Sequence, residues 1–429
     1  MTAVVAGAGL AGSEAAWQLA ERGVDVTLCD MKPASRTRAH HSPHFCELCC
    51  SNSLRGNHIT AAPGLLKEEL RRVGSMVVEC ADASAVPAGS ALAVDREAFS
   101  LAVTQRLLSH PRITVVCEEL TRLPPQRPLI VATGPLTSGA LARDISSFLG
   151  GAEFLHFHDA AAPLVAAESV DMTKAYFGSR HGKGQDDYLN CPMDKECYKA
   201  LRQALCEAER APLSHGDGEE PPAFFEGCLP VEEMARRGED TLRFGPLRPI
   251  GLRDGAGRSA YAVAQLRRDN AAGSVYNLVG FQTRLTFARQ KRAFSLIPAL
   301  ANAEYLRFGV MHRNTYIDSP RLLTSSFEVR AAPGVYFAGQ LTGVEGYVES
   351  IASGLTAALG KPFPEDTALG ALGRYISDPR AEDFQPMNIN FGLFPPPPPH
   401  VPKHAKKQAL AERALMSLGR YLDEEMILP

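Results

Sequence analysis

The first thirty residues constrain the fold more than any other part of the chain. Residues 3–6 (AVVA) form a short apolar run typical of a buried strand, and three glycines follow in G-x-G-x-x-G spacing: Gly7, Gly9 and Gly12. Apolar residues recur at helical spacing over 13–22, and residues 24–28 (VDVTL) favour a second strand. A strand, a glycine turn, a helix and a strand in this order predict a βαβ unit that binds a dinucleotide.

Each glycine of this motif has a mechanical role in the predicted site. Gly7 allows a tight turn, Gly9 lets a pyrophosphate approach the backbone, and Gly12 lets the helix pack closely on the strand. The helix N-terminus offers N–H groups to phosphates. Asp30, at the end of the second strand, is expected to accept hydrogen bonds from a ribose diol. We therefore expect the dinucleotide to contact the whole turn: Gly7, Ala8, Gly9, Leu10, Ala11 and Gly12. The alternative is a structural glycine-rich turn without a ligand.

Two later segments favour FAD over NAD. Residues 128–138 (PLIVATGPLTS) contain a buried strand, and residues 334–358 contain a strand, a glycine-bearing turn and a helix. A strand that leads into a helix N-terminus late in the chain can place backbone N–H groups near an isoalloxazine ring. The alternative is that both are ordinary strands of one sheet. The expected cofactor contacts in these segments are Thr133, Gly134, Gly339, Gly346 and Ser350.

The dinucleotide-binding domain is therefore expected to be discontinuous. Residues 1–153 form its first part, and residues 318–429 form its second part with a C-terminal helix. Residues 154–317 mix expected strands and helices and are predicted to form an inserted substrate domain. The predicted fold class is α/β, a discontinuous Rossmann-like FAD-binding domain with an inserted α+β domain.

Cysteines gather in the segment CELCCSNSLR (46–55), which holds Cys46, Cys49 and Cys50. A structural zinc site usually needs a further cysteine or histidine pair at regular spacing. The sequence supplies none, so no metal is expected. A disulfide between the two adjacent cysteines would need a strained ring. Cys228 lies in a turn before a helix expected over 231–237, whose N-terminus favours a thiolate. From the residues alone, a small buried hydrophobic side chain is the better explanation of either cysteine site.

Charge and hydropathy limit the functions of the chain. The formal net charge of −3 at pH 7 does not favour nucleic-acid binding without a local basic patch. No apolar run reaches the roughly 18 residues of a membrane span. Ten cysteines without a recognisable secretory signal make a reduced, cytoplasmic setting the expectation. One basic cluster, for which a solvated helix face is the default explanation, provides candidate RNA contacts: Arg284, Arg289, Lys291 and Arg292.

The glycine motifs are common to many flavoproteins, but several longer motifs of this chain are specific to one family. They include CSNSLR (50–55), LLKEEL (65–70), FFEGCLPVEEMARRG (224–238), GVMHRNTYIDSPRLL (309–323) and FAGQLTGVEGYVES (337–350). With them the chain resembles, nearly from end to end, the TrmFO family of folate- and FAD-dependent tRNA (uracil-5-)-methyltransferases. The resemblance implies methylenetetrahydrofolate as one-carbon donor, reduced FAD as carrier and reductant, and NAD(P)H as electron source. The acceptor would be C5 of the T-loop uridine of tRNA. The expected partner is tRNA; no membrane is expected, and no protein partner is implied.

The resemblance also implies roles for individual residues. The two functional cysteines of the family correspond to Cys50 and Cys228. Cys228 is favoured as the nucleophile that adds to C6 of uracil, with Cys50 as its partner near the flavin. Candidates for the base that removes the C5 proton are Glu226, Glu345 and Glu349.

Other residues near these motifs have smaller expected roles. Cys46 and Cys49 are expected to have no chemical role, and Asp30 stands where many members of the family have Glu. Arg36 and Arg38 join the basic cluster as expected tRNA contacts. Two other functions stay open at this point. One is an FAD-dependent oxidoreductase of a small substrate, and the other is a non-catalytic flavoprotein that binds RNA.

Overall fold

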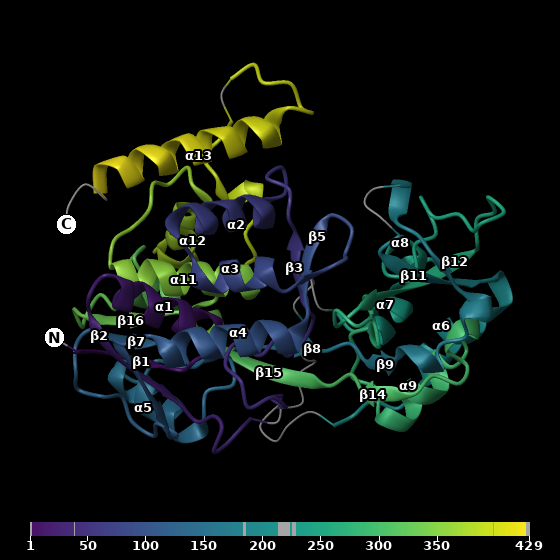
Figure 1. The fold of residues 1–429 in the computed structure, drawn as a ribbon, viewed down its shortest axis with the longest axis horizontal. Helices are drawn as coiled ribbons and strands as arrows, with labels where there is room; N and C mark the ends of the chain where they lie inside the picture. Colours follow the sequence, from purple (N-terminus) through teal and green to yellow (C-terminus); the bar gives the residue numbers. More distant parts are fainter. Residues whose placement is uncertain are drawn as a thin grey trace.

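The computed structural model describes residues 2–37, 39–182, 186–212, 224, 229–397 and 399–425, and it has two lobes (Figure 1). The first lobe, on the left in the figure, contains the two ends of the described chain and a hydrophobic core drawn from both. The second lobe, on the right, has a separate core formed by residues between Val165 and Ala303. The fold class is α/β, as predicted.

A five-stranded parallel sheet forms the centre of the first lobe. Its strands are short and apolar, and those of its middle are buried on both faces, as is usual for parallel sheets covered by helices. Their order is β16 (Val335–Phe337), β7 (Leu129–Val131), β1 (Thr2–Ala6), β2 (Asp25–Asp30) and β6 (Ile113–Cys117). Strands from opposite ends of the sequence therefore lie in one sheet.

The predicted βαβ unit is present, with different boundaries. Helix α1 (Leu10–Glu21) begins three residues earlier than expected, inside the glycine motif, because Gly9 serves as its N-cap. Strand β2 extends to Asp30 because Cys29 and Asp30 pair with β6. The late strand β16 ends at Phe337, before Gly339, and helix α11 (Tyr347–Leu359) follows the glycine-bearing turn.

Helices α1 and α11 pack against each other beside the sheet (Figure 1). A side chain at Gly354 of α11 would place its Cβ 2.0 Å from the carbonyl oxygen of Ala11. The two helices can approach this closely only because glycine stands at the contact. The contact joins the first turn of α1 to the middle of α11.

The second lobe is built on a six-stranded antiparallel sheet. The helices α6 (Lys195–Glu207), α7 (Val231–Arg237) and α9 (Phe287–Phe294) belong to this lobe. The order of its strands is β10 (Tyr176–Phe177), β11 (Tyr188–Met193), β12 (Ala262–Arg268), β13 (Val275–Leu278), β9 (Leu164–Ala166) and β14 (Tyr305–Arg307).

An antiparallel pair, β8 (Leu155–Ala160) and β15 (Met311–Tyr316), carries the chain into the second lobe and back (Figure 1). A small separate sheet contains β3 (Ser53–Gly56), β5 (Ala91–Val94) and β4 (Ala85–Val86), in that order. The C-terminal helix α13 (Lys406–Glu425) packs on the first lobe. The domain boundaries 1–153, 154–317 and 318–429 stay a prediction. Within the described part of the chain, no helix combines the length and apolar character that crossing a membrane requires.

Candidate active site

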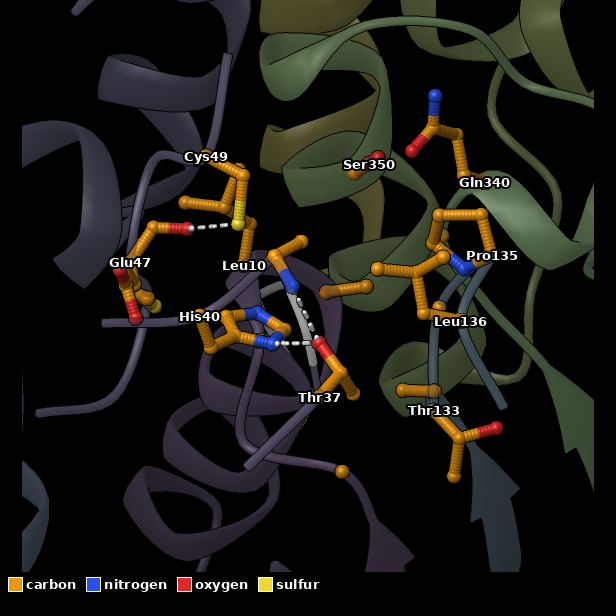
Figure 2. Close-up of a pocket in the computed structure, with 18 of the residues that line it drawn as sticks. Leu10, Thr37, His40, Glu47, Cys49, Thr133, Pro135, Leu136, Gln340 and Ser350 are labelled. Atoms are coloured by element: carbon orange, nitrogen blue, oxygen red, sulfur yellow. Dashed lines mark hydrogen bonds between the residues drawn. The ribbon is translucent and has the colours of Figure 1, made fainter. Parts of the chain in front are cut away.

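A cavity of about 410 Å³ opens at the carboxyl ends of β1, β2, β7 and β16 (Figure 2). This edge is where open parallel sheets bind ligands. Residues after all four strands line it, and the figure shows Thr133, Leu136 and Gln340 opposite Thr37, His40 and Cys49. Nearly all predicted cofactor residues are brought together here: Gly7, Ala8, Gly9, Leu10, Ala11, Asp30, Thr133, Gly134, Gly339, Gly346 and Ser350. We call Gly7–Leu10 with Gly339 and Gly346 the glycine wall.

The glycines of the first turn differ in what a side chain would meet. Gly7 has φ +97°, and a Cβ there would lie 2.5 Å from the carbonyl oxygen of Ala132. A Cβ on Gly12 would lie 1.8 Å from the carbonyl oxygen of Gly7, and Gly12 does not line the cavity. Gly9 has no atom within 4 Å of its Cβ position. Gly7 and Gly12 thus allow neighbouring backbone segments to pack closely, whereas Gly9 leaves open space beside the backbone.

Two helix N-termini face the cavity. The N-cap of α1 is Gly9 and the N-cap of α11 is Gly346, and neither provides a side-chain cap. The first N–H groups of both helices are therefore available to a ligand, and the helix dipoles favour an anion there. An open cradle at Gly9 beside a helix N-terminus fits the pyrophosphate of a dinucleotide.

Asp30 lies at the end of β2 and is held in place by backbone donors. Its Oδ2 accepts a hydrogen bond from the N–H of Ala8 at 2.6 Å, and its Oδ1 accepts one from the N–H of Lys32 at 2.8 Å. A carboxylate oxygen can accept more than one hydrogen bond. The geometry therefore orients Asp30 and leaves it able to receive a ribose diol.

Cys50 also lines the cavity, on a segment that both lobes hold. Its N–H donates to Tyr347 Oη at 2.9 Å and its Sγ to the carbonyl oxygen of Ala160 at 3.5 Å. Its carbonyl oxygen accepts from Arg96 at 3.3 Å and from Arg307 at 3.4 Å. Two cationic side chains therefore fix the backbone of Cys50.

The residues after Cys50 are fixed by the second lobe. Arg267 of β12 donates to Ser51 Oγ at 2.8 Å and to Asn52 Oδ1 at 2.9 Å. Asn52 is fully buried and donates to the carbonyl oxygens of Val94 and Arg268. We call the segment Cys49–Ser51, with Arg96 and Arg307 behind it, the cysteine wall.

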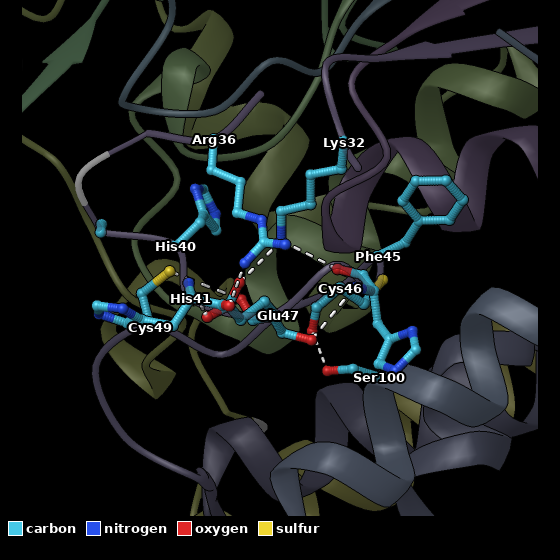
Figure 3. Close-up of polar contacts among 12 residues, drawn as sticks. Lys32, Arg36, His40, His41, Phe45, Cys46, Glu47, Cys49 and Ser100 are labelled. Atoms are coloured by element: carbon cyan, nitrogen blue, oxygen red, sulfur yellow. Dashed lines mark hydrogen bonds and ion pairs between the residues drawn. The ribbon is translucent and has the colours of Figure 1, made fainter. Parts of the chain in front are cut away.

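The residues before Cys50 are fixed by a buried ion pair (Figure 3). Lys32 Nζ lies 2.8 Å from Glu47 Oε2 and also donates to the carbonyl oxygen of His44 at 2.9 Å. Glu47 Oε1 accepts from the N–H of His41 at 2.7 Å. Burial disfavours the charge on Glu47, but the hydrogen bond and charge of Lys32 outweigh it and lower the pKa of this carboxyl.

Cys46 and Cys49 differ from Cys50 in their surroundings. Burial raises the pKa of each of these two thiols to about 12. Both are therefore neutral thiols at physiological pH and poor nucleophiles. All cysteines among the described residues are free, and those residues contain no group of three or more His, Cys, Asp or Glu that could hold a metal ion.

Two buried carboxyl groups line the cavity at the start of α11. Burial, followed by the charge of Asp159, raises the pKa of Glu345 to about 8, and Gln340 donates to its Oε2 at 2.6 Å. Burial also raises the pKa of Glu349, which accepts from Arg55 at 3.3 Å through Oε1. Its Oε2 is buried and has no hydrogen-bond partner among the described atoms.

The predicted basic residues are not part of the cavity lining, with the exception of Arg36. Arg284 donates to the carbonyl oxygen of Ala211 at 2.8 Å, and Arg289 lies 3.7 Å from Glu209. Lys291 and Arg292 are exposed on α9. Their role in tRNA binding stays a prediction. Three predicted residues lie outside the described ones: Cys228, Glu226 and Arg38.

Sequence reasoning missed the side chains that hold the cysteine wall. Arg96, Arg267 and Arg307 come from two lobes, and no local pattern relates them to Cys50. Tyr347 lies within a motif that we had singled out, next to Gly346, but only the fold shows that it reaches Cys50. Long-range hydrogen bonds of this kind leave no spacing signal in a single sequence.

Comparison with known proteins gives close relatives over the full chain. The family described as glucose inhibited division protein A matches residues 2–360. The methylenetetrahydrofolate–tRNA-(uracil-5-)-methyltransferase TrmFO of Heliobacterium modesticaldum is 54% identical over 440 residues, which cover 100% of this chain and 99% of that protein. The protein of the same name from Moorella thermoacetica is 54% identical over 424 residues, 96% of each chain.

Solved structures agree with the fold. GidA of Aquifex aeolicus, in its form I crystal, superposes with a TM-score of 0.67 over 99% of this chain and 78% of that one. The sequence identity is 13%, so this likeness concerns the fold alone.

Proposed function

This chain belongs to the TrmFO family of methylenetetrahydrofolate–tRNA-(uracil-5-)-methyltransferases, and we propose that it methylates C5 of the T-loop uridine of tRNA. The observation that carries the proposal is that the glycine wall and Cys50 line one cavity. A backbone segment suited to binding a dinucleotide and a candidate active-site thiol therefore line the same cavity.

FAD is the cofactor that the residues of this cavity fit. The open backbone at Gly9, the two uncapped helix N-termini and Asp30 would hold its pyrophosphate and ribose. When bound, FAD would supply the carrier for the one-carbon unit and, after reduction by NAD(P)H, the hydride that completes the methyl group. The cytoplasmic setting stays a prediction.

Methylation at C5 of uracil requires a nucleophile, and a cysteine thiolate can provide it. C5 of uracil is a weak nucleophile until a thiolate adds to C6 and makes C5 enolate-like. We assign this addition to the pair Cys50 and Cys228, with Cys228 still favoured as the attacking sulfur. Arg96 and Arg307 hold the backbone of Cys50 through its carbonyl oxygen.

A base must then take the C5 proton so that the thiolate can leave C6. Glu345 lines the cavity, and burial raises its pKa to about 8. A general base works best with a pKa near the operating pH. Glu349 is paired with the cation Arg55 and also accepts from the N–H of Ile389 at 3.0 Å. The described side-chain partner of Glu345 is instead the neutral Gln340. Glu345 is therefore the better of the two described candidates.

The test is transfer of label to tRNA. Purified protein is incubated with FAD, NADPH, unmodified tRNA transcript and methylenetetrahydrofolate labelled in its methylene carbon, and the tRNA is digested to nucleosides. We expect label in 5-methyluridine. NADPH consumption without label would favour an oxidoreductase of a small substrate. Binding of tRNA without either reaction would favour a non-catalytic flavoprotein.

A further inference from the structure

Three aromatic side chains of the second lobe form a parallel stack. The ring centroid of Phe308 lies 4.8 Å from that of Phe287, with 12° between the planes, and 5.2 Å from that of Tyr305, with 10° between the planes. Among the described aromatic pairs, Phe287 and Tyr305 each contact Phe308 and not each other, so Phe308 lies between them. We call these three residues the aromatic stack.

The aromatic stack differs from the packing of buried rings in the same lobe. Phe281 and Phe294 meet edge to face at 86°, which is a common arrangement for rings in a core. The near-parallel arrangement of the aromatic stack instead has the geometry of stacked bases. Its inner ring, Tyr305, has a hydroxyl buried without a described hydrogen-bond partner, whereas the outer ring, Phe287, is 54% exposed. The stack therefore ends on a ring that a further planar group can cover.

Hydrogen bonds and close backbone contacts hold the aromatic stack next to the cavity. Gly309, the residue after the middle ring, exchanges two hydrogen bonds of 2.8 Å with the side chain of Gln290 on α9. A Cβ on Gly309 would lie 2.7 Å from the carbonyl oxygen of Ala161, which lines the cavity. Arg307, the residue before Phe308 in the sequence, donates to the carbonyl oxygen of Cys50. The same short segment thus touches the cavity wall and carries the stack.

Helix α9 adds positive charge next to the exposed ring. Lys291 and Arg292 are exposed on this helix, which begins at Phe287 and contains no acidic residue. Arg289 lies 3.7 Å from Glu209, so part of its charge is balanced. An exposed aromatic face beside cationic side chains is the combination by which proteins bind single-stranded nucleic acid.

We propose that an unpaired base next to the target uridine stacks on Phe287, and that Lys291 and Arg292 contact the adjoining phosphates. This inference rests on the proposed methylation of tRNA. A uridine that enters the cavity must leave its own stack, and its neighbours lose stacking partners. The aromatic stack replaces a lost partner at the rim, which offsets part of the cost of unstacking.

The test compares the tRNA affinity of substituted proteins. Stacking of one base on an aromatic side chain contributes roughly 1–3 kcal/mol, so Phe287→Ala should raise the Kd for tRNA about 5- to 150-fold. Phe287→Tyr, which keeps the ring, should stay within about twofold of the unsubstituted protein. The double variant Lys291→Ala and Arg292→Ala should reduce the dependence of log Kd on log salt by about 1.4–1.8, whereas Phe287→Ala should leave that slope unchanged.

The matched control is Phe244→Ala, because Phe244 is 78% exposed in the same lobe and stacks on no ring among the described aromatic pairs. It should leave the Kd unchanged. Equal loss of affinity in the two alanine variants, or no loss in Phe287→Ala, would overturn the proposal. FAD content and the melting temperature of each variant show whether the fold is kept. Failure of the proposed function would look different, since the unsubstituted protein itself would then transfer no label to tRNA.

Discussion

The glycine wall of the cavity presents backbone to a ligand, whereas the cysteine wall presents a thiol that side chains from elsewhere hold in place. Gly7 of the glycine wall, and Gly12 directly behind it on α1, have no room for a Cβ because neighbouring backbone occupies the space. Cys50 owes its position to Tyr347, Arg96 and Arg307, which are distant in sequence. The first wall is thus formed by local geometry and the second by long-range contacts, so substitutions in the two walls should fail in different ways.

The largest effect is expected from Gly12→Ala. A Cβ 1.8 Å from the carbonyl oxygen of Gly7 forces α1 away from β1, and overpacking against backbone costs about 3 kcal/mol or more. We expect loss of FAD binding together with a lower melting temperature. Gly9→Ala is the matched control, because no atom lies within 4 Å of its Cβ position. It should keep the melting temperature of the apoprotein and weaken FAD binding only. Equal melting temperatures in both variants would contradict the assignment of these roles.

Cys50→Ala should separate the two walls. Removal of an active-site thiol lowers the rate of transfer by roughly a thousandfold or more, whereas the glycine wall is unchanged and should keep its FAD. Label in 5-methyluridine and flavin absorbance, measured on the same preparation, check this expectation. Transfer at the normal rate would remove Cys50 from the active site.

Lys32→Met should destabilise the segment that leads into the cysteine wall. Glu47 would be left buried without its cation, and loss of one partner of a buried pair costs about 3–5 kcal/mol. The pKa of Glu47 is lowered in the folded protein, so the stabilisation is present at neutral pH and is lost as the pH falls below the carboxyl's ordinary range. Urea unfolding at pH 7 measures the effect. The double variant Lys32→Met and Glu47→Leu should recover part of the stability, and no recovery would argue against the ion pair as the cause.

Glu345→Gln tests the base through its pH dependence. The ionised form prevails only above about pH 8, so transfer should rise with pH up to that value, and the variant should be about a hundredfold slower without this rise. The raised pKa also means that the folded apoprotein holds one more proton than the unfolded chain between pH 4.5 and about 8. Its stability should therefore fall as the pH rises through this range. Denaturant unfolding at pH 6 and 8.5 should show less of this fall in Glu345→Gln. A variant with an unchanged pH–rate profile would exclude Glu345 as the base.

The smallest effect is expected from Cys49→Ala. Burial raises the pKa of this thiol to about 12, so it is neutral during catalysis. Transfer should stay within about twofold of the unsubstituted protein. Loss of activity comparable to that of Cys50→Ala would mean that the adjacent thiol takes part in the chemistry.

The sequence predicts the glycine wall well because the physical causes of that wall are local. The spacing of Gly7, Gly9 and Gly12 indicates the turn, and the β-prone run before it indicates the strand. The start of α1 was predicted three residues late because glycine is a weak helix former, and the close packing of α1 on α11 overrides that preference.

The cysteine wall shows the limit of such reasoning. Resemblance to a family indicates Cys50, but nothing near it in the chain indicates that Arg267 and Arg307 of the second lobe hold its segment. The basic residues were chosen by sequence clustering, and clustering does not separate Arg284, which bonds to a main-chain carbonyl, from the exposed Lys291. Only the fold distinguishes a structural arginine from one that can meet a ligand.

A crystal structure of the protein reconstituted with FAD tests most directly whether the two walls serve one cofactor and one pyrimidine. The pyrophosphate should lie against the backbone of Gly9 and Leu10, and the edge of the isoalloxazine ring that carries N5 should face Cys50 across a space the width of a pyrimidine. An isoalloxazine ring bound on the far side of the sheet from Cys50, or shielded from it by ordered protein, would contradict the account.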